Sequence, residues 1–130
     1  MEENQIRWSV IDPLGNEIVL KESVFIDHVL GEHKTKDADI RASLEEQVKI
    51  ILQSPRFIIK DRNFPNRRKY LDLVAVTVSG TNKVKTVGII VEVEVEPFVV
   101  VTWYARRVMD EPFTNEELIY HAGFQGTSRV

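Results

Sequence analysis

Alternating apolar and polar positions mark several β-strands along the chain. Residues 7–11 and 17–20 alternate on either side of a segment that contains Asp12, Pro13 and Gly15. Pro followed by Gly is typical of a turn, so this pattern predicts an N-terminal β-hairpin. Further apolar stretches predict strands at 57–60, 70–78, 83–96 and 98–106. Because the connections between these four strands are too short for crossovers, we expect antiparallel pairing.

Apolar residues spaced three and four apart predict two helices between the hairpin and these strands. Ser23 can cap a short helix at 24–30. A longer helix begins near Asp37 or Asp39 and ends before Pro55. Its apolar stripe comprises Ile40, Leu44, Val48, Ile51 and Leu52. Another face of this helix carries Arg41, Glu45 and Lys49, a spacing that is typical of a solvated side.

The end of the chain predicts a third, short helix. Thr114-x-x-Glu117 matches a capping box, which places a helix up to about His121. The fold class is therefore α+β, with an N-terminal hairpin and two helices packed on one face of a four-stranded antiparallel sheet. We expect residues 1–112 to form a single domain and residues 113–130 to form the C-terminal helix and a flexible tail.

The last two strands differ in the chemistry of their faces. In 87–96 the odd positions are apolar from Val87 to Val95, and positions 92, 94 and 96 are Glu. Three such carboxylates can bind a divalent cation, but side by side on one strand they more often favour solubility. In 98–106 the odd positions should contact the helices, and the even positions end in Thr102, Tyr104 and Arg106. This row suits a phosphate or a base, although a half-exposed strand has a similar composition.

A basic segment interrupts an acidic chain. The 130 residues contain 17 Lys and Arg against 20 Asp and Glu, a net charge of −3. This balance excludes a generally basic nucleic-acid coat. Asp61 is the only acidic residue in 60–69, and the basic residues there are Lys60, Arg62, Arg67, Arg68 and Lys69. The segment is either a loop that attracts an anionic partner or a solvated loop.

Other features narrow the class of protein. Without cysteine, the chain has no disulfides, thiolate zinc sites or cysteine nucleophile. No apolar run approaches the roughly 20 residues that span a membrane, and the polar start is unlike a signal peptide, so we expect a cytoplasmic protein with no membrane partner. Phosphate-binding loops, Gly-x-Gly-x-x-Gly and Gly-x-Ser-x-Gly are absent from the sequence, which argues against ATPases, dinucleotide enzymes and hydrolase folds.

Two histidines follow the hairpin. His28 and His33 lie at and beyond the C-terminal end of the first predicted helix, where the protonated imidazole is favoured. They are candidates for general acid and base, or else ordinary surface or packing residues. A zinc site is a weak alternative, because the spacing is not i, i+4 and only His121 remains as a third histidine.

The order of these features resembles the barnase–EndoU–colicin–RelE-like (BECR) nuclease superfamily, especially its phage- and mobile-element-associated branch. The resemblance covers residues 8–107. It rests on the Asp-x-x-Gly hairpin, the two histidines, Gln53-Ser54-Pro55, the basic residues before Tyr70, and Val-Val-Val-Thr-x-Tyr at 99–104. It implies a metal-independent endoribonuclease without a cofactor, in a toxin-type effector with a possible neutralising protein partner.

The resemblance implies cleavage by attack of the RNA 2′-hydroxyl on phosphorus. His28 or His33 would act as base or acid, and the other implied catalytic residues are Arg68, Thr102, Tyr104 and Arg106. The implied substrate-binding residues are Lys60, Arg62, Arg67, Lys69 and Tyr70. The alternative is a non-catalytic RNA- or protein-binding module of the same fold, and the oligomeric state stays open. A third alternative is an interaction protein that pairs through an edge strand.

Overall fold

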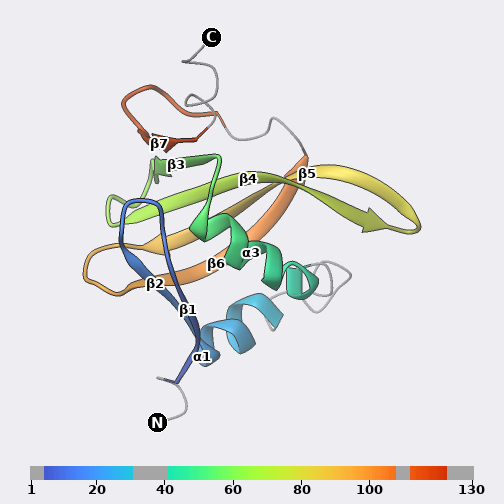
Figure 1. Ribbon diagram of the computed structural model, residues 1–130, viewed down its shortest axis with the longest axis horizontal. Helices are drawn as coiled ribbons and strands as arrows, with labels where there is room; N and C mark the ends of the chain where they lie inside the picture. Colours follow the sequence, from blue (N-terminus) through green and yellow to red (C-terminus); the bar gives the residue numbers. More distant parts are fainter. Residues whose placement is uncertain (1–4, 31–40, 108–111, 123–130) are drawn as a thin grey trace.

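A single mixed β-sheet of seven strands organises the chain in a computed structural model that describes residues 5–30, 41–107 and 112–122 (Figure 1). The strand order is β1-β2-β6-β5-β4-β3-β7. The strands are β1 (Ile6–Ile11), β2 (Glu17–Lys21), β3 (Phe57–Lys60), β4 (Arg67–Val78), β5 (Thr81–Glu92), β6 (Phe98–Arg107) and β7 (Leu118–His121). The helical segments are α1 (Glu22–Val24), η2 (Phe25–Leu30) and α3 (Glu45–Gln53).

The prediction of a four-stranded sheet with helices is wrong, because strands from both ends of the chain extend the sheet. Strands β3 to β6 pair in antiparallel fashion as expected. The N-terminal hairpin joins them through parallel pairing of Ile18 and Val19 with Phe98 and Val99. At the other edge β7 pairs with β3. The described part of the chain is therefore mostly sheet, with short helical segments on one face (Figure 1).

The expected C-terminal helix is replaced by a turn and a strand. A carboxylate oxygen of Glu117 accepts a hydrogen bond from the Thr114 amide at 2.8 Å, as in a capping box. The chain then turns, and Ile58 of β3 pairs with Tyr120 of β7. Ile119 and Tyr120 pack against the core from this position. Sheet pairing at a free edge thus outweighs the local helix signal.

Helix α3 buries the predicted apolar stripe over the described positions. Leu44, Val48, Ile51 and Leu52 are all buried, which confirms this part of the prediction. The prediction that Arg41 lies on a solvated face is wrong, because only 7% of this residue is exposed. Its guanidinium donates to the carbonyl of Trp103 at 2.9 Å, along the edge of β6 where β2 no longer pairs.

A β-bulge in β6 changes which side chains face the core. Ile90 pairs with Thr102, whereas Val91 pairs with Val100, so Val101 is an extra residue in β6. The core therefore takes even positions before the bulge (Phe98 and Val100) and odd positions after it (Trp103 and Ala105). The predicted alternation is correct for the second half of the strand and wrong for the first half.

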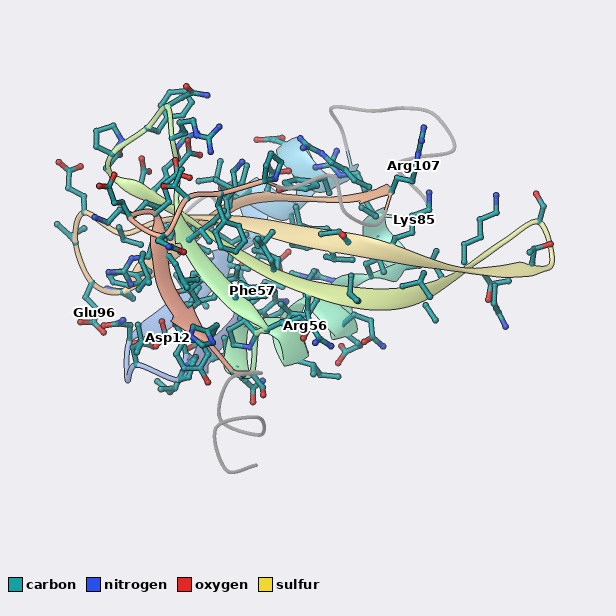
Figure 2. The ribbon with its side chains drawn as sticks, turned by 90° about the horizontal axis from the view of Figure 1, so that it is seen from above. Asp12, Arg56, Phe57, Lys85, Glu96 and Arg107 are labelled. Atoms are coloured by element: carbon teal, nitrogen blue, oxygen red, sulfur yellow. The ribbon has the colours of Figure 1, made fainter. Side chains whose placement is uncertain are left out.

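Strands β4 and β5 continue beyond the rest of the sheet as a two-stranded arm (Figure 1). Strand β3 pairs with β4 only as far as Leu71, and β6 ends opposite Lys85. Ser79 and Gly80 form the two-residue turn at the tip with φ of 54° and 78°, as a type I′ hairpin requires. Lys85 and Arg107 lie together at the base of the arm, at the opposite end of the sheet from Asp12 (Figure 2).

Candidate functional site

A cleft of about 160 Å³ gathers several of the basic residues that the sequence singled out. It is lined by Ile59, Lys60, Arg62, Asn63, Lys69, Arg106, Pro112 and Glu117. Ile59 of β3 is directly paired with Lys69 of β4. The adjacent pair of the same two strands, Ile58 and Tyr70, is buried beneath helix α3. Because neighbouring strand residues point to opposite faces, the cleft lies on the sheet face that the helices leave open.

Local hydrogen bonds hold the loop between β3 and β4 that forms one side of this cleft. A carboxylate oxygen of Asp61 accepts from the amides of Asn63 and Phe64, at 2.8 and 3.1 Å. The amide of Arg67 donates to the carbonyl of Phe64 at 3.0 Å. An aspartate that bonds the backbone two residues ahead is typical of an Asx turn. These hydrogen bonds within the loop hold the backbone of Arg62 and Asn63 in place.

Arg62 and Glu117 form a two-pronged ion pair at the edge of the cleft. The Nε and Nη2 atoms of Arg62 donate to the two Glu117 oxygens at 2.8 and 2.9 Å. These bonds, together with the Thr114 amide, lower the pKa of Glu117 from 4.5 to about 2. Glu117 is therefore ionised at neutral pH and is a weak proton acceptor, so its role in the cleft is to hold Arg62.

This ion pair predicts an unusual acid titration. We expect the Glu117 carboxyl carbon, followed by NMR, to titrate near pH 2 in the native protein and at a clearly higher pH in Arg62→Ala, where the Thr114 amide remains as a donor. Because the folded pKa is depressed, the stabilisation from this pair is complete above about pH 4.5 and is lost as the pH falls toward 2. Arg56→Ala, which removes an arginine bound to Asp72 instead, is the control. Native titration near pH 4.5 would contradict the ion pair.

Arg106 reaches the cleft from β6, beside Tyr104. Its guanidinium carbon lies 4.2 Å from the centroid of the Tyr104 ring, a cation–π contact. Tyr104 pairs with Gly88 on β5, and a Cβ atom at position 88 would lie 2.3 Å from the Tyr104 Cζ and Oη atoms. Glycine at position 88 therefore leaves space for the ring, which lies across the sheet beside Arg106.

Other predicted site residues have structural partners elsewhere. The Thr102 hydroxyl accepts a hydrogen bond from Arg41. Tyr70 is 0% exposed, and its hydroxyl donates to Asp12 at 2.6 Å. Burial, followed by the interaction with Asp12, raises the pKa of Tyr70. Arg68 pairs with Lys60 and lies 5.4 Å from the centroid of the Phe98 ring. These contacts are consistent with roles in packing.

The segment that carries His28 lies on the other face of the sheet from the cleft. His28 belongs to η2, and Phe25 of the same segment contacts Trp103 with ring centroids 6.3 Å apart. This contact places the segment on the helix-covered face, whereas Tyr104 lies on the other face. His33 lies outside the described residues. In the described ranges, His, Cys, Asp and Glu form no group of three or more that could hold a metal ion.

Two residues important for the cleft escaped the sequence analysis as site residues. Phe64 is exposed within the basic segment next to the cleft, and an aromatic ring among cations is the signal that could have identified it. Glu117 lies 55 positions from Arg62, so only the pairing of β7 with β3 brings them together. The capping-box motif identified Glu117 but gave it a different role.

Similarity to known proteins does not identify this site. No family model matches the chain, and neither a curated protein nor a solved structure is significantly similar to it. The described helices include none that is long and apolar enough to cross a membrane. The function must therefore be argued from the cleft itself.

Proposed function

We propose that this protein binds RNA and holds its phosphate backbone in the cleft lined by Lys60, Arg62, Lys69 and Arg106. One observation carries the proposal: basic residues from β3, β4, β6 and the β3–β4 loop line one cleft in a chain of net charge −3. Arg and Lys are the side chains that bind phosphate oxygens most strongly. A local positive site on an acidic protein attracts a polyanion to that site in particular. RNA is the expected polyanion because of the resemblance in the sequence.

Binding is favoured over cleavage by the chemistry of the cleft. Transesterification needs a base and an acid that exchange protons near neutral pH. Among the described residues that line the cleft, the basic side chains donate hydrogen bonds and Glu117, with a pKa of about 2, stays ionised. These groups suit the binding of phosphate and the stabilisation of its charge. They do not supply the proton transfer.

Endoribonuclease activity is the second candidate function, favoured by the Arg106 guanidinium stacked on Tyr104 at the cleft. The test is incubation of purified protein with several RNAs in EDTA. Intact RNA supports the binding module. Product ends carrying a 2′,3′-cyclic phosphate, formed by the native protein and lost in Arg106→Ala, would establish the nuclease instead. Loss of these ends in a His28→Ala/His33→Ala variant would further assign the proton transfer to the histidines.

Removal of one cleft cation is expected to weaken RNA binding about fivefold at 0.1 M salt. For single strands, the logarithm of the affinity falls by about 0.7 per phosphate contact for each tenfold increase in salt. One contact therefore raises the affinity at 0.1 M salt roughly fivefold relative to 1 M salt. Lys69→Ala and Arg106→Ala should each show this loss in the fluorescence anisotropy of an end-labelled RNA. The salt slope, about −2 to −3 for three or four contacts, should become shallower by about 0.7 in each variant.

Lys83→Ala is the matched control, because it removes the same charge from the arm. Lys83 pairs with Val76 of β4, and Val76 lies seven residues from Lys69 along that strand. The backbone positions of Lys83 and Lys69 are therefore about 24 Å apart along the strand direction. Its affinity should equal that of the native protein. Equal losses in Lys69→Ala and Lys83→Ala would mean that overall charge, and not the cleft, determines binding. Absence of salt-dependent binding would remove the proposal.

A further inference from the structure

Phe64 presents an aromatic ring to solvent from a loop that internal hydrogen bonds hold in place. The residue is 49% exposed although its loop is fixed by the Asp61 turn and by the bond from the Arg67 amide to the Phe64 carbonyl. At the end of the loop, the amide of Val93 donates to the carbonyl of Asn66 at 2.8 Å. Exposure of a large apolar ring has no benefit for packing. A fixed loop also reduces the entropy that a ligand must overcome to order the ring.

Arg67 supports this ring from one side. Its guanidinium carbon lies 4.6 Å from the centroid of the Phe64 ring. Glu92 lies on the neighbouring strand, with a carboxylate oxygen 3.8 Å from Arg67 Nε. Arg67 is thus held between an aromatic ring and a carboxylate, and it restricts the orientation of Phe64. The part of the ring that Arg67 does not cover is available to a ligand.

The position of Phe64 beside the cleft indicates the nature of that ligand. Asn63, its neighbour in the chain, lines the cleft together with Arg62. A chain of phosphates in the cleft would carry its bases within reach of the adjacent loop. Aromatic rings next to basic grooves are the usual platforms for unpaired bases, because every base has a flat π-face. Paired bases in a duplex are already stacked on one another and are not available to such a ring.

We propose that Phe64 is a stacking platform for an unpaired base, so that the cleft selects single-stranded RNA. The inference rests on the proposed function, since the cleft cations hold the backbone of the same strand. Phe64 provides the preference for single strands, and Lys69 and Arg106 provide the affinity for phosphate. The two contributions are separable, because an exposed phenylalanine carries no charge.

The experiment compares one labelled RNA strand with its duplex, using native protein and three variants. Native protein is expected to bind the single strand at least fivefold more tightly than the duplex, the lower end of what base–aromatic stacking contributes. Phe64→Ala should lose this preference and leave duplex binding unchanged. Phe64→Leu, which retains an apolar side chain without a π-face, should behave like Phe64→Ala. Ile50→Ala removes a side chain of similar exposure (57%) from helix α3 on the other face and should behave like the native protein.

A second readout reports stacking directly. A strand with 2-aminopurine should lose fluorescence on binding native protein, because stacking quenches this base, and should keep it on binding Phe64→Ala. If Lys69→Ala weakens binding while Phe64→Ala keeps both the preference and the quenching, the stacking inference is overturned and the phosphate cleft stands. If native protein binds neither RNA form, both proposals fail.

Discussion

Replacement of Trp103 by alanine is expected to lower the free energy of unfolding by about 3–5 kcal/mol, the range for deletion of a large buried aromatic side chain. Trp103 is 0% exposed and lies among the largest side chains of the core. Its indole donates to the carbonyl of Arg41 at 2.8 Å, and its ring contacts Phe25. The substitution therefore leaves a cavity beneath the helical segments and an acceptor without its donor. Urea denaturation followed by circular dichroism measures the loss.

Trp103→Phe makes the prediction testable even if the alanine variant does not fold. Phenylalanine retains most of the buried ring but cannot donate to the Arg41 carbonyl. We expect a smaller loss, of about 1–3 kcal/mol, because a buried carbonyl is left unpaired. A loss below 1 kcal/mol in Trp103→Ala would contradict the placement of this residue in a closely packed core.

Tyr70→Phe is expected to lower the free energy of unfolding by about 1–3 kcal/mol and to leave RNA affinity unchanged. The substitution removes the hydroxyl that donates to Asp12, in a place that water does not reach. Asp12 also accepts from the amides of Leu14 and Asn16, so it connects the β1–β2 turn to the centre of the sheet. Denaturation measures the first effect, and RNA anisotropy measures the second.

A double-mutant cycle with Asp12→Asn separates the Tyr70–Asp12 bond from other effects of the two substitutions. We expect the two losses to be less than additive, because both variants disrupt the same hydrogen bond. Tyr120→Phe, in the half-buried β7, is the control for loss of a phenolic hydroxyl. If Tyr70→Phe instead weakened RNA binding fivefold or more at native stability, the substrate-binding role implied by the sequence would replace the structural one.

The sequence predicts strands well where alternation is regular and fails where a single residue breaks it. The hairpin β1–β2 and the strands β3, β4 and β6 appear close to the expected ranges, whereas β5 ends at Glu92, four residues before the expected end, and leaves Val95 exposed. The extra residue Val101 carries no local signal, because it is one valine in a run of three. Only the pairing of β6 with β5 determines which of the three valines has no partner on β5. The faces of the first half of β6 were therefore assigned wrongly.

Long-range pairing explains the remaining errors in the fold. The parallel contact of β2 with β6 joins Ile18 to Phe98, and no turn or spacing motif encodes such a contact. The same holds for β7, where the local signal favoured a helix. In both cases an unpaired sheet edge gains hydrogen bonds from a distant segment, and this gain exceeds the preference of a short sequence.

The candidate site was predictable where its residues are close in sequence. The basic segment 60–69 was identified from charge alone, and Lys60, Arg62 and Lys69 meet at the cleft. Tyr70 lies next to Lys69 but on the opposite face, so proximity in sequence does not bring it into the cleft. Arg106 was identified from the composition of its strand. Its position in the cleft depends on the register of three strand pairings, which the alternation pattern does not determine.

The arm formed by the outer parts of β4 and β5 also affects the solution behaviour of the protein. In the described structure, residues 75–84 have no third strand beside them, and Val84 is exposed there. Such ribbons tend to recruit strands from other molecules and aggregate. Lys83 on this ribbon and Lys85 at its base place positive charges there, and we expect these charges to disfavour pairing of two copies edge to edge.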